Sequence, residues 1–299
     1  MAWKGVYPIV TTKFTKDDKV DLAAMEHCFA VQIEAGIHGV IVCGSLSEGG
    51  FLTREEKKEI VSLFVSVSSG RLPVLSSIGE PVTRDAELHA RDAQEAGAVG
   101  LMVIPSSYYF ADERETIANL SDIAAASDLP IMIYNNPGTY RVNVTLDMYE
   151  ELAKNPKFVA IKECSDDIRI TTDLITRFGE RYQVFGGMDN LALESILAGA
   201  PGWAAGVCAA FPSETMAIYH LANAGRFEEA WAIYRWFRPL LDLDETAKLV
   251  QNIKLMEQVV LGTNDYVRRP RRPLSGTERE GVLKIIHHAL ETRPTLPKL

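Results

Sequence analysis

One lysine stands where a side chain could form a covalent bond with a substrate. The apolar stretch 158–161, Phe-Val-Ala-Ile, runs directly into Lys162. Such a run is typical of a strand buried on both faces, so Lys162 would lie at the mouth of whatever the strand enters. Burial disfavours the ammonium form of lysines, and a neutral amine can attack a carbonyl and form a Schiff base. The alternative is an ordinary lysine whose ammonium extends into solvent beyond a strand end.

Tyr134 is the second candidate for catalysis. It would end the strand next to that of Lys162, so the two side chains could converge. A tyrosine in that place can relay protons to and from a carbinolamine and the neighbouring carbon atom. Without Lys162, the same residue would be interpreted as a tyrosine at the edge of the core with a satisfied hydroxyl. The pair together favours carbonyl chemistry.

A loop rich in glycine and serine, 44–52, follows a short apolar run that ends at Cys43. Gly44, Ser45 and the backbone N–H groups of this loop precede a helix that would begin near Thr53. Such an arrangement suits an anion, most simply the carboxylate of a substrate. A loop of this kind ahead of a helix is usually no more than a turn, and the residues alone leave both interpretations open.

Short apolar runs and helix patterns alternate along most of the chain. The runs predicted as strands cover 6–10, 39–43, 73–78, 100–104, 130–134, 158–163, 182–185 and 202–207. Strands that alternate with helices imply a parallel sheet, and eight such units favour a closed barrel. An open doubly wound sheet would be supported by a GxGxxG turn after an early strand, which the sequence lacks. We predict an α/β fold, a (β/α)8 TIM barrel, over residues 1–225.

The alternation of strands and helices stops after Gly225. Apolar residues at helical spacing predict three further helices, at 226–241, 246–261 and 277–291. No Gly/Ser-rich linker separates them from the barrel, so we expect a C-terminal helical extension, 226–299, that packs outside the barrel or beside its mouth. The basic run 268–273 is short and broken by prolines, which favours a solvated connection over a phosphate or nucleic-acid patch.

In barrels of this kind the working residues lie at the C-terminal ends of the strands and on the loops that follow. The predicted strand ends hold one amine, several hydroxyls and phenols, and no cluster of His, Asp or Glu. These residues are Thr11, Thr12, Ser45, Ser47, Ser76, Ser77, Tyr108, Tyr109, Tyr134, Lys162, Gly186, Gly187 and Cys208. The set suits a lysine-dependent carbonyl enzyme.

Metal-dependent and serine-triad mechanisms find little support in the residue pattern. A metal site would require two or three His, Asp or Glu ligands on strand ends, and a Ser-His-Asp triad would require a histidine there. The histidines lie mostly on predicted helices or in loops away from these ends; they are His27, His38, His89, His220, His287 and His288. We therefore expect no metal ion, and imine chemistry on a lysine requires no cofactor.

The composition is ordinary for a soluble globular protein, with 47% apolar and 24% charged residues. The net charge of −9 argues against a nucleic-acid or anionic-membrane partner, so we expect a small-molecule substrate. No apolar run approaches the ~20 residues of a membrane helix, and the first residues lack the long apolar region of a signal peptide. The four cysteines form no CxxC pair and look like buried thiols. We therefore expect a cytoplasmic protein.

Three short motifs carry a resemblance to a known family along essentially the whole chain. Gly-Ser-Leu-Ser-Glu at 44–48, Tyr-Asn-Asn-Pro at 134–137 and Ala-Ile-Lys-Glu at 160–163 fall in order at three strand ends. They resemble the GTTGE-like loop, the YNxP motif and the lysine strand of the dihydrodipicolinate synthase / N-acetylneuraminate lyase family. That family consists of class I aldolase-like (β/α)8 enzymes that form a lysine Schiff base.

The resemblance implies roles for particular residues. Lys162 would be the Schiff-base lysine and Tyr134 the proton shuttle. Ser45, with the amide of Leu46, would hold the substrate carboxylate. Tyr108 would complete the proton relay, in many members across a dimer interface. The usual assembly of the family implies a homotetramer made of two tight dimers.

Three other residues are expected at the substrate-binding face. Tyr140 follows the YNxP-like motif, Gly187 follows a predicted strand end, and Ala204 lies on the last predicted strand. We expect all three to contribute to the choice of substrate.

Two departures from the family pattern narrow the expected reaction. The synthase places an arginine shortly after YNxP to bind its second substrate, whereas this chain has Thr139 there and the nearest arginine, Arg141, is displaced. Lysine biosynthesis, as 4-hydroxy-tetrahydrodipicolinate synthase, is therefore a less favoured function. In the anion-binding loop, Leu46 replaces the second hydroxyl and Ser47 replaces a glycine, which weakens the assignment of carboxylate binding to that loop.

One subgroup is more similar than the others. Tyr140, the helix stretch 226–241 and the tail 269–274 look like the bacterial 1-pyrroline-4-hydroxy-2-carboxylate deaminases, which act in hydroxyproline breakdown. The expected products are 2,5-dioxopentanoate and ammonia. Alternatives that use the same parts are a 5-dehydro-4-deoxyglucarate dehydratase and a 2-keto-3-deoxy acid aldolase. A non-catalytic barrel that binds a keto acid is the alternative from another class, although binding alone would need neither Lys162 nor Tyr134.

Overall fold

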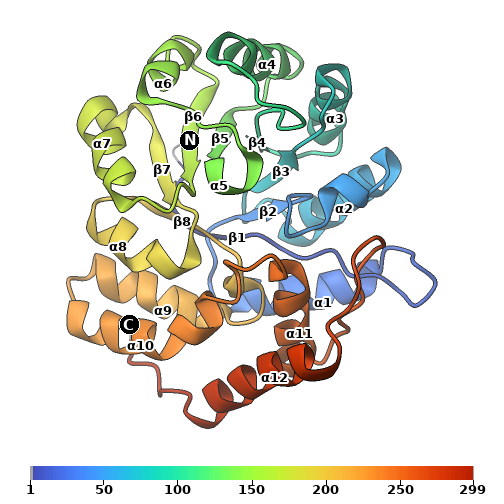
Figure 1. Ribbon diagram of the computed structural model, residues 1–299, viewed down its shortest axis with the longest axis vertical. Helices are drawn as coiled ribbons and strands as arrows, with labels where there is room; N and C mark the ends of the chain where they lie inside the picture. The colour runs from blue at the N-terminus through green and yellow to red at the C-terminus, as the bar shows by residue number, and fades with distance from the viewer. Residues whose placement is uncertain (1–2, 299) are drawn as a thin grey trace.

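Eight parallel strands form a barrel at the centre of the molecule, in a computed structural model that describes residues 3–298 (Figure 1). The strands are β1 (Gly5–Pro8), β2 (Val40–Val42), β3 (Val74–Ile78), β4 (Gly100–Val103), β5 (Ile131–Asn135), β6 (Phe158–Glu163), β7 (Gln183–Gly186) and β8 (Gly202–Ala205). They are hydrogen-bonded in the order β1-β8-β7-β6-β5-β4-β3-β2, and a parallel bridge between Ile9 and Ile41 joins β1 to β2. The predicted (β/α)8 TIM barrel is confirmed.

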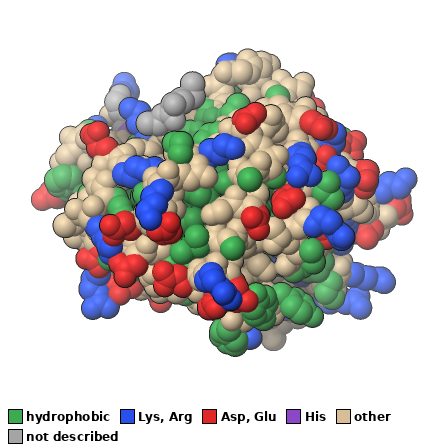
Figure 2. Space-filling model, turned by 90° about the horizontal axis from the view of Figure 1, so that it is seen from above, with side chains coloured by type: hydrophobic (Ala, Val, Ile, Leu, Met, Phe, Trp, Pro, Cys, Tyr) green, Lys and Arg blue, Asp and Glu red, His purple; other side chains and the backbone are tan. Residues whose placement is uncertain are grey.

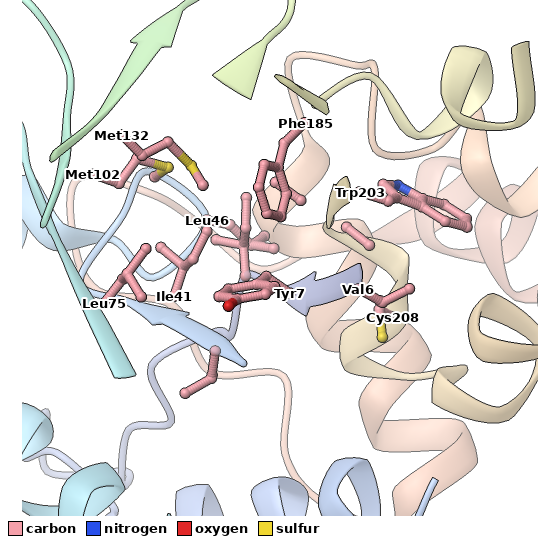
Figure 3. Close-up of a cluster of buried hydrophobic side chains, with 14 of the residues drawn as sticks. Val6, Tyr7, Ile41, Leu46, Leu75, Met102, Met132, Phe185, Trp203 and Cys208 are labelled. Carbon is pink, nitrogen blue, oxygen red and sulfur yellow. The ribbon is translucent and has the colours of Figure 1, made fainter. Parts of the chain in front are cut away.

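The interior of the barrel is packed with apolar side chains from successive strands. Figure 3 shows Tyr7, Ile41, Leu75 and Phe185 directed toward one another, and all four are buried. The rings of Tyr7 and Phe185 meet edge to face, with centroids 5.2 Å apart, an arrangement that aromatic quadrupoles favour. Because side chains fill the barrel, it has no open channel. A substrate therefore binds at an end of the barrel and not within it.

Helices follow the strands and surround the barrel (Figure 1). They are α1 (Leu22–Glu34), α2 (Arg54–Ser68), α3 (Thr83–Glu95), α4 (Glu113–Ala125), α6 (Leu146–Leu152), α7 (Ile168–Phe178), α8 (Ala192–Leu197) and α9 (Pro212–Asn223). Thr53 and Asp112 form capping boxes that satisfy the first N–H groups of α2 and α4. These caps fix the residues at which the two helices begin, and therefore where the preceding loops end. Those loops carry the strand-end residues.

A further short helix, α5 (Pro137–Tyr140), was not expected from the sequence. The Asn136 side chain begins it by accepting a hydrogen bond from the Thr139 N–H at 3.0 Å, and Arg141 ends it with a left-handed φ of 62°. Four residues are too few to produce a helical periodicity in the sequence. The helix matters because it turns Tyr140 back toward the end of the barrel.

The chain closes with three helices, α10 (Phe227–Leu241), α11 (Leu249–Leu261) and α12 (Gly276–Glu291), as predicted. Figure 1 shows them along one side of the barrel, beyond β8 and β1. α10 packs on α9, and α12 packs on both α10 and α11. No helix of residues 3–298 is long and apolar enough to cross a membrane.

Two buried ion pairs attach α11 to loops at the end of the barrel. Lys13 Nζ lies 2.5 Å from Glu257 Oε2, and Lys254 Nζ lies 2.5 Å from Glu48 Oε1, with all four side chains at most 1% exposed. Thr11 Oγ1 also donates to Glu257 Oε2, at 2.7 Å. A charge left alone in such a place would be costly, so each partner holds the other in position.

Removing one member of a buried pair should strongly destabilise the fold. For Glu257→Ala, which leaves Lys13 buried without its carboxylate, we expect the free energy of unfolding to fall by about 3–5 kcal/mol, measured by chemical denaturation. The matched control is Glu151→Ala, which removes the exposed pair with Lys154 and should cost less than about 1 kcal/mol. Equal losses for the two variants would contradict this account of α11.

Candidate active site

A cavity of about 740 Å³ opens at the C-terminal end of the barrel. Its wall is built by the ends of several strands, by the loop after β2 and by the segment that leads into α11. The residues used below that line it are Ser45, Leu46, Glu48, Phe51, Tyr134, Tyr140, Lys162, Gly187, Gly206, Asp244, Glu245 and Arg271. Lys162 and Tyr134 therefore share one cavity, as their strand-end positions predicted.

Lys162 is 4% exposed and lies near the end of β6. It is in register with Tyr134 on β5, and its Nζ lies 4.0 Å from the centroid of the Tyr134 ring. A Cβ at Gly187, just beyond β7, would lie 2.7 Å from Lys162 Cε, so only glycine leaves room for the lysine there. Among residues 3–298, no carboxylate forms an ion pair with Lys162. The amine is held in place without a counter-ion among these residues.

Two tyrosines and a serine continue from the lysine across the cavity. The rings of Tyr134 and Tyr140 meet edge to face with centroids 5.6 Å apart, and the hydroxyls of Tyr140 and Ser45 are hydrogen-bonded to each other. Burial, with smaller contributions from Cys164 and Tyr140, raises the pKa of Tyr134 well above 10. Tyr134 therefore keeps its proton at neutral pH and can donate it to a nearby oxygen or nitrogen atom.

The loop after β2 is held rigidly around Ser45. Ser47 Oγ donates to the Val10 carbonyl at 2.5 Å, and Thr12 Oγ1 donates to the Ser47 carbonyl at 2.6 Å. Leu46 is buried, and Figure 3 shows it over the barrel core close to Ile41 and Tyr7. The loop therefore offers a single hydroxyl, that of Ser45, to a ligand in the cavity.

Two of the predicted site residues do not line the cavity. Ala204 is buried within β8, paired with Tyr7 of β1, and its contact with substrate stays a prediction. The chain reaches the cavity only two residues later, at Gly206, just beyond β8. Tyr108 is 88% exposed and lies outside the cavity of its own chain; its role across a subunit interface stays a prediction.

The C-terminal segment contributes residues that the sequence did not single out. Asp244 and Glu245, just before α11, line the cavity, and so does Arg271, between α11 and α12. The basic run 268–273 is therefore more than a solvated connection. Arg268 in the same run pairs with Glu56 at 2.6 Å. Only tertiary packing brings these residues to the barrel mouth, so no local pattern could have found them.

Three carboxyl groups gather on the β7–β8 side of the cavity. Asp189 is buried and accepts hydrogen bonds from Trp203 Nε1 at 2.8 Å and from the Val207 N–H at 2.7 Å. Burial, and then repulsion from Asp189, raises the pKa of Glu245 to about 7. Burial, Asp189 and Glu245 likewise raise the pKa of Asp244 well above its usual range. A carboxyl group with a raised pKa carries less negative charge at neutral pH and is a weaker counter-ion for a nearby amine. No group of three or more His, Cys, Asp or Glu within residues 3–298 is arranged to hold a metal ion.

The raised pKa of Glu245 makes the stability of the protein depend on pH. Its pKa is about 7 in the folded protein and near 4.5 for an unperturbed glutamate. Between these values the folded protein binds more protons than the unfolded chain, so the free energy of unfolding falls as pH rises. Glu245→Gln cannot titrate, and we expect a smaller decline between about pH 5 and pH 8 in chemical denaturation. Glu151→Gln, at an exposed position, should keep the wild-type slope. Identical slopes for all three proteins would contradict the raised pKa.

A family model described as the dihydrodipicolinate synthetase family matches residues 2–289. A 4-hydroxy-tetrahydrodipicolinate synthase of Methanospirillum hungatei is 32% identical over 241 residues, which cover 80% of this chain and 82% of the relative. A mitochondrial protein of Coccidioides immitis named "Putative 4-hydroxy-2-oxoglutarate aldolase" is 30% identical over 233 residues, 76% of this chain and 74% of its own.

Solved structures are similar along nearly the whole chain. A dihydrodipicolinate synthase from Bacillus anthracis has a TM-score of 0.91 and 25% identity, covering 96% of this chain and 99% of its own. A sialic acid aldolase from Ruminococcus gnavus, described as a catalytic lysine mutant, has a TM-score of 0.89 and covers 97% of both chains. Its 23% identity bears on the fold alone.

Proposed function

The chain belongs to the dihydrodipicolinate synthetase family and is an enzyme of this lyase and aldolase group; on this premise we propose that it forms a Schiff base through Lys162. The observation that carries the proposal is the placement of Lys162 in the cavity wall, with its amine 4.0 Å from the Tyr134 ring and without an ion-pair partner among residues 3–298. An amine held in this way is free to attack the carbonyl or imine carbon of a substrate.

We propose 1-pyrroline-4-hydroxy-2-carboxylate as the substrate, in agreement with the subgroup resemblance of the sequence. Lys162 Nζ attacks C2, the imine carbon that bears the carboxylate, and the C2–N1 bond breaks to leave an amine on C5. The lysine is then bonded to C2 as an imine. This imine withdraws electrons from C3, so a C3 proton can leave.

Loss of water follows from the acidity at C3. Tyr134, which holds its proton at neutral pH because its pKa is raised, donates that proton to the departing C4 hydroxyl and takes the C3 proton in its place. One proton then leaves C5 and one leaves the amine nitrogen on C5, while C3 and C4 each gain a proton, which places an imine at C5. Water hydrolyses this imine to an aldehyde and ammonia, and a second water releases the 2-oxo group from Lys162. One water molecule leaves and two enter, which gives 2,5-dioxopentanoate and ammonia.

Aldol cleavage is the second candidate, favoured by the similarity to the Coccidioides immitis protein named as an aldolase. A 4-hydroxy-2-oxo acid bound to Lys162 as an imine could break its C3–C4 bond, with electrons again accepted by the imine. Dehydration of a deoxy-keto sugar acid would use the same lysine. Synthesis of hydroxy-tetrahydrodipicolinate is less favoured, since Thr139 lines the cavity where the synthase pattern has arginine.

We further propose a homotetramer built from two dimers, in which Tyr108 meets the site of a second copy. The support is an exposed aromatic stretch in the loop after β4, where Tyr108 is 88%, Tyr109 53% and Phe110 73% exposed. Such a stretch is unusual on the surface of a monomer. Figure 2, which views the molecule from the α4 and α6 side, shows hydrophobic side chains gathered at one edge and charges of both signs interspersed elsewhere.

Ammonia release tests the proposed reaction. The wild-type protein should release ammonia from 1-pyrroline-4-hydroxy-2-carboxylate, and Lys162→Ala should release none above the background rate, because no covalent intermediate can form. Lys157→Ala, which removes a lysine near the opposite end of β6, should retain activity. Ammonia from Lys162→Ala at a wild-type rate would exclude the lysine mechanism. No ammonia from the wild type would exclude this substrate and leave the aldol candidate.

A further inference from the structure

Arg271 is a cationic residue of the cavity wall that the proposed chemistry does not use. It lies in the loop between α11 and α12, and its side chain is 28% exposed. Its Nη1 is buried and, within residues 3–298, has no hydrogen-bond partner. The exposed part of the side chain lines the cavity, and an anion bound there could accept a hydrogen bond from this part of the guanidinium.

Within residues 3–298, the carboxylate that pairs with this donor is that of Glu48, which other donors already engage. Glu48 Oε2 lies 3.7 Å from Arg271 Nη1, beyond hydrogen-bond distance. Glu48 accepts hydrogen bonds from Lys254 Nζ at 2.5 Å and from the Arg268 N–H at 3.0 Å. One carboxylate thus faces two cations, Lys254 and Arg271. The local excess of positive charge favours an anion at this wall of the cavity.

The position of Arg271 links it to Ser45. Its guanidinium lies over the ring of Phe51, 4.7 Å from the centroid, and Phe51 belongs to the same loop, 44–52, as Ser45. It is also close enough to Tyr140 to lower the pKa of that phenol, against the larger rise caused by burial. Because Tyr140 is hydrogen-bonded to Ser45, Ser45, Tyr140 and Arg271 border the same part of the cavity.

We infer that Arg271, together with Ser45, binds the carboxylate adjacent to the carbon that Lys162 attacks. The loop after β2 provides a single hydroxyl because Leu46 occupies the next position, and a guanidinium supplies the charge and the second donor that a carboxylate needs. The enzyme would accordingly select 2-oxo acids, or imines with a 2-carboxylate, over neutral ketones. The inference rests on the proposed imine chemistry at Lys162.

Pyruvate is a suitable probe because its only carboxylate adjoins the carbonyl carbon. The whole protein is treated with borohydride at a series of pyruvate concentrations, and mass spectrometry measures the fraction that carries the reduced adduct. The pyruvate concentration that gives half of the maximal adduct is then compared between variants. We expect this concentration to rise about 10–100-fold in Arg271→Met, the range expected for one lost charge-assisted pair, and by less in Arg271→Lys. The adduct at saturating pyruvate should match the wild type. Arg272→Met, which changes the exposed neighbour in the same loop, should leave the concentration unchanged.

Acetone, which lacks the carboxylate, separates recognition from a general disturbance of the site. The preference of the wild type for pyruvate over acetone should fall by a similar factor in Arg271→Met, while acetone trapping stays unchanged. An unchanged pyruvate titration in Arg271→Met, or an equal shift in Arg272→Met, would overturn the inference. If Arg271→Met does not fold, Arg271→Gln takes its place in the same titrations. Absence of any adduct in the wild type would instead remove the proposed imine chemistry.

Discussion

The buried amine of Lys162 is the constraint on which the rest of the site depends. An amine removed from water is costly unless it is paired, yet residues 3–298 provide no ion-pair partner for this one. The parallel register of β5 and β6 sets it against the Tyr134 ring, and Gly187 leaves space for its methylene chain. Burial, and then repulsion from Asp189, raises the pKa values of Asp244 and Glu245. Within residues 3–298 neither carboxyl forms an ion pair with the lysine, and their raised pKa values lower the negative charge that they carry at neutral pH.

The C-terminal helices complete this site as well as covering the barrel. The buried pairs Lys13–Glu257 and Lys254–Glu48 fix α11 against the loops at the barrel mouth. Because α11 is fixed there, the segment before it brings Asp244 and Glu245 into the cavity, and the loop after it brings Arg271. Glu48 illustrates the coupling, since its single carboxylate joins the loop that carries Ser45 to both α11 and the following loop.

The parts of the site that follow from strand order could be predicted from the sequence. Alternating apolar runs place Tyr134 and Lys162 at the ends of neighbouring strands, and parallel pairing then makes them neighbours in space. The sequence did not indicate that Gly206 and not Ala204 would line the cavity, because a run of small apolar residues does not mark where a strand leaves the core. Arg271 was missed because prolines and neighbouring arginines are typical of exposed loops. Its place in the cavity depends on the packing of α11, which the local sequence does not encode.

The most direct test of the central claim is to locate the covalent bond. Wild-type protein would be reduced with borohydride during turnover of 1-pyrroline-4-hydroxy-2-carboxylate, digested, and mapped by peptide mass spectrometry. The account predicts one modified peptide, with the added mass on the ε-amine of Lys162. Modification of a different lysine, or an unmodified Lys162 during steady ammonia release, would contradict it.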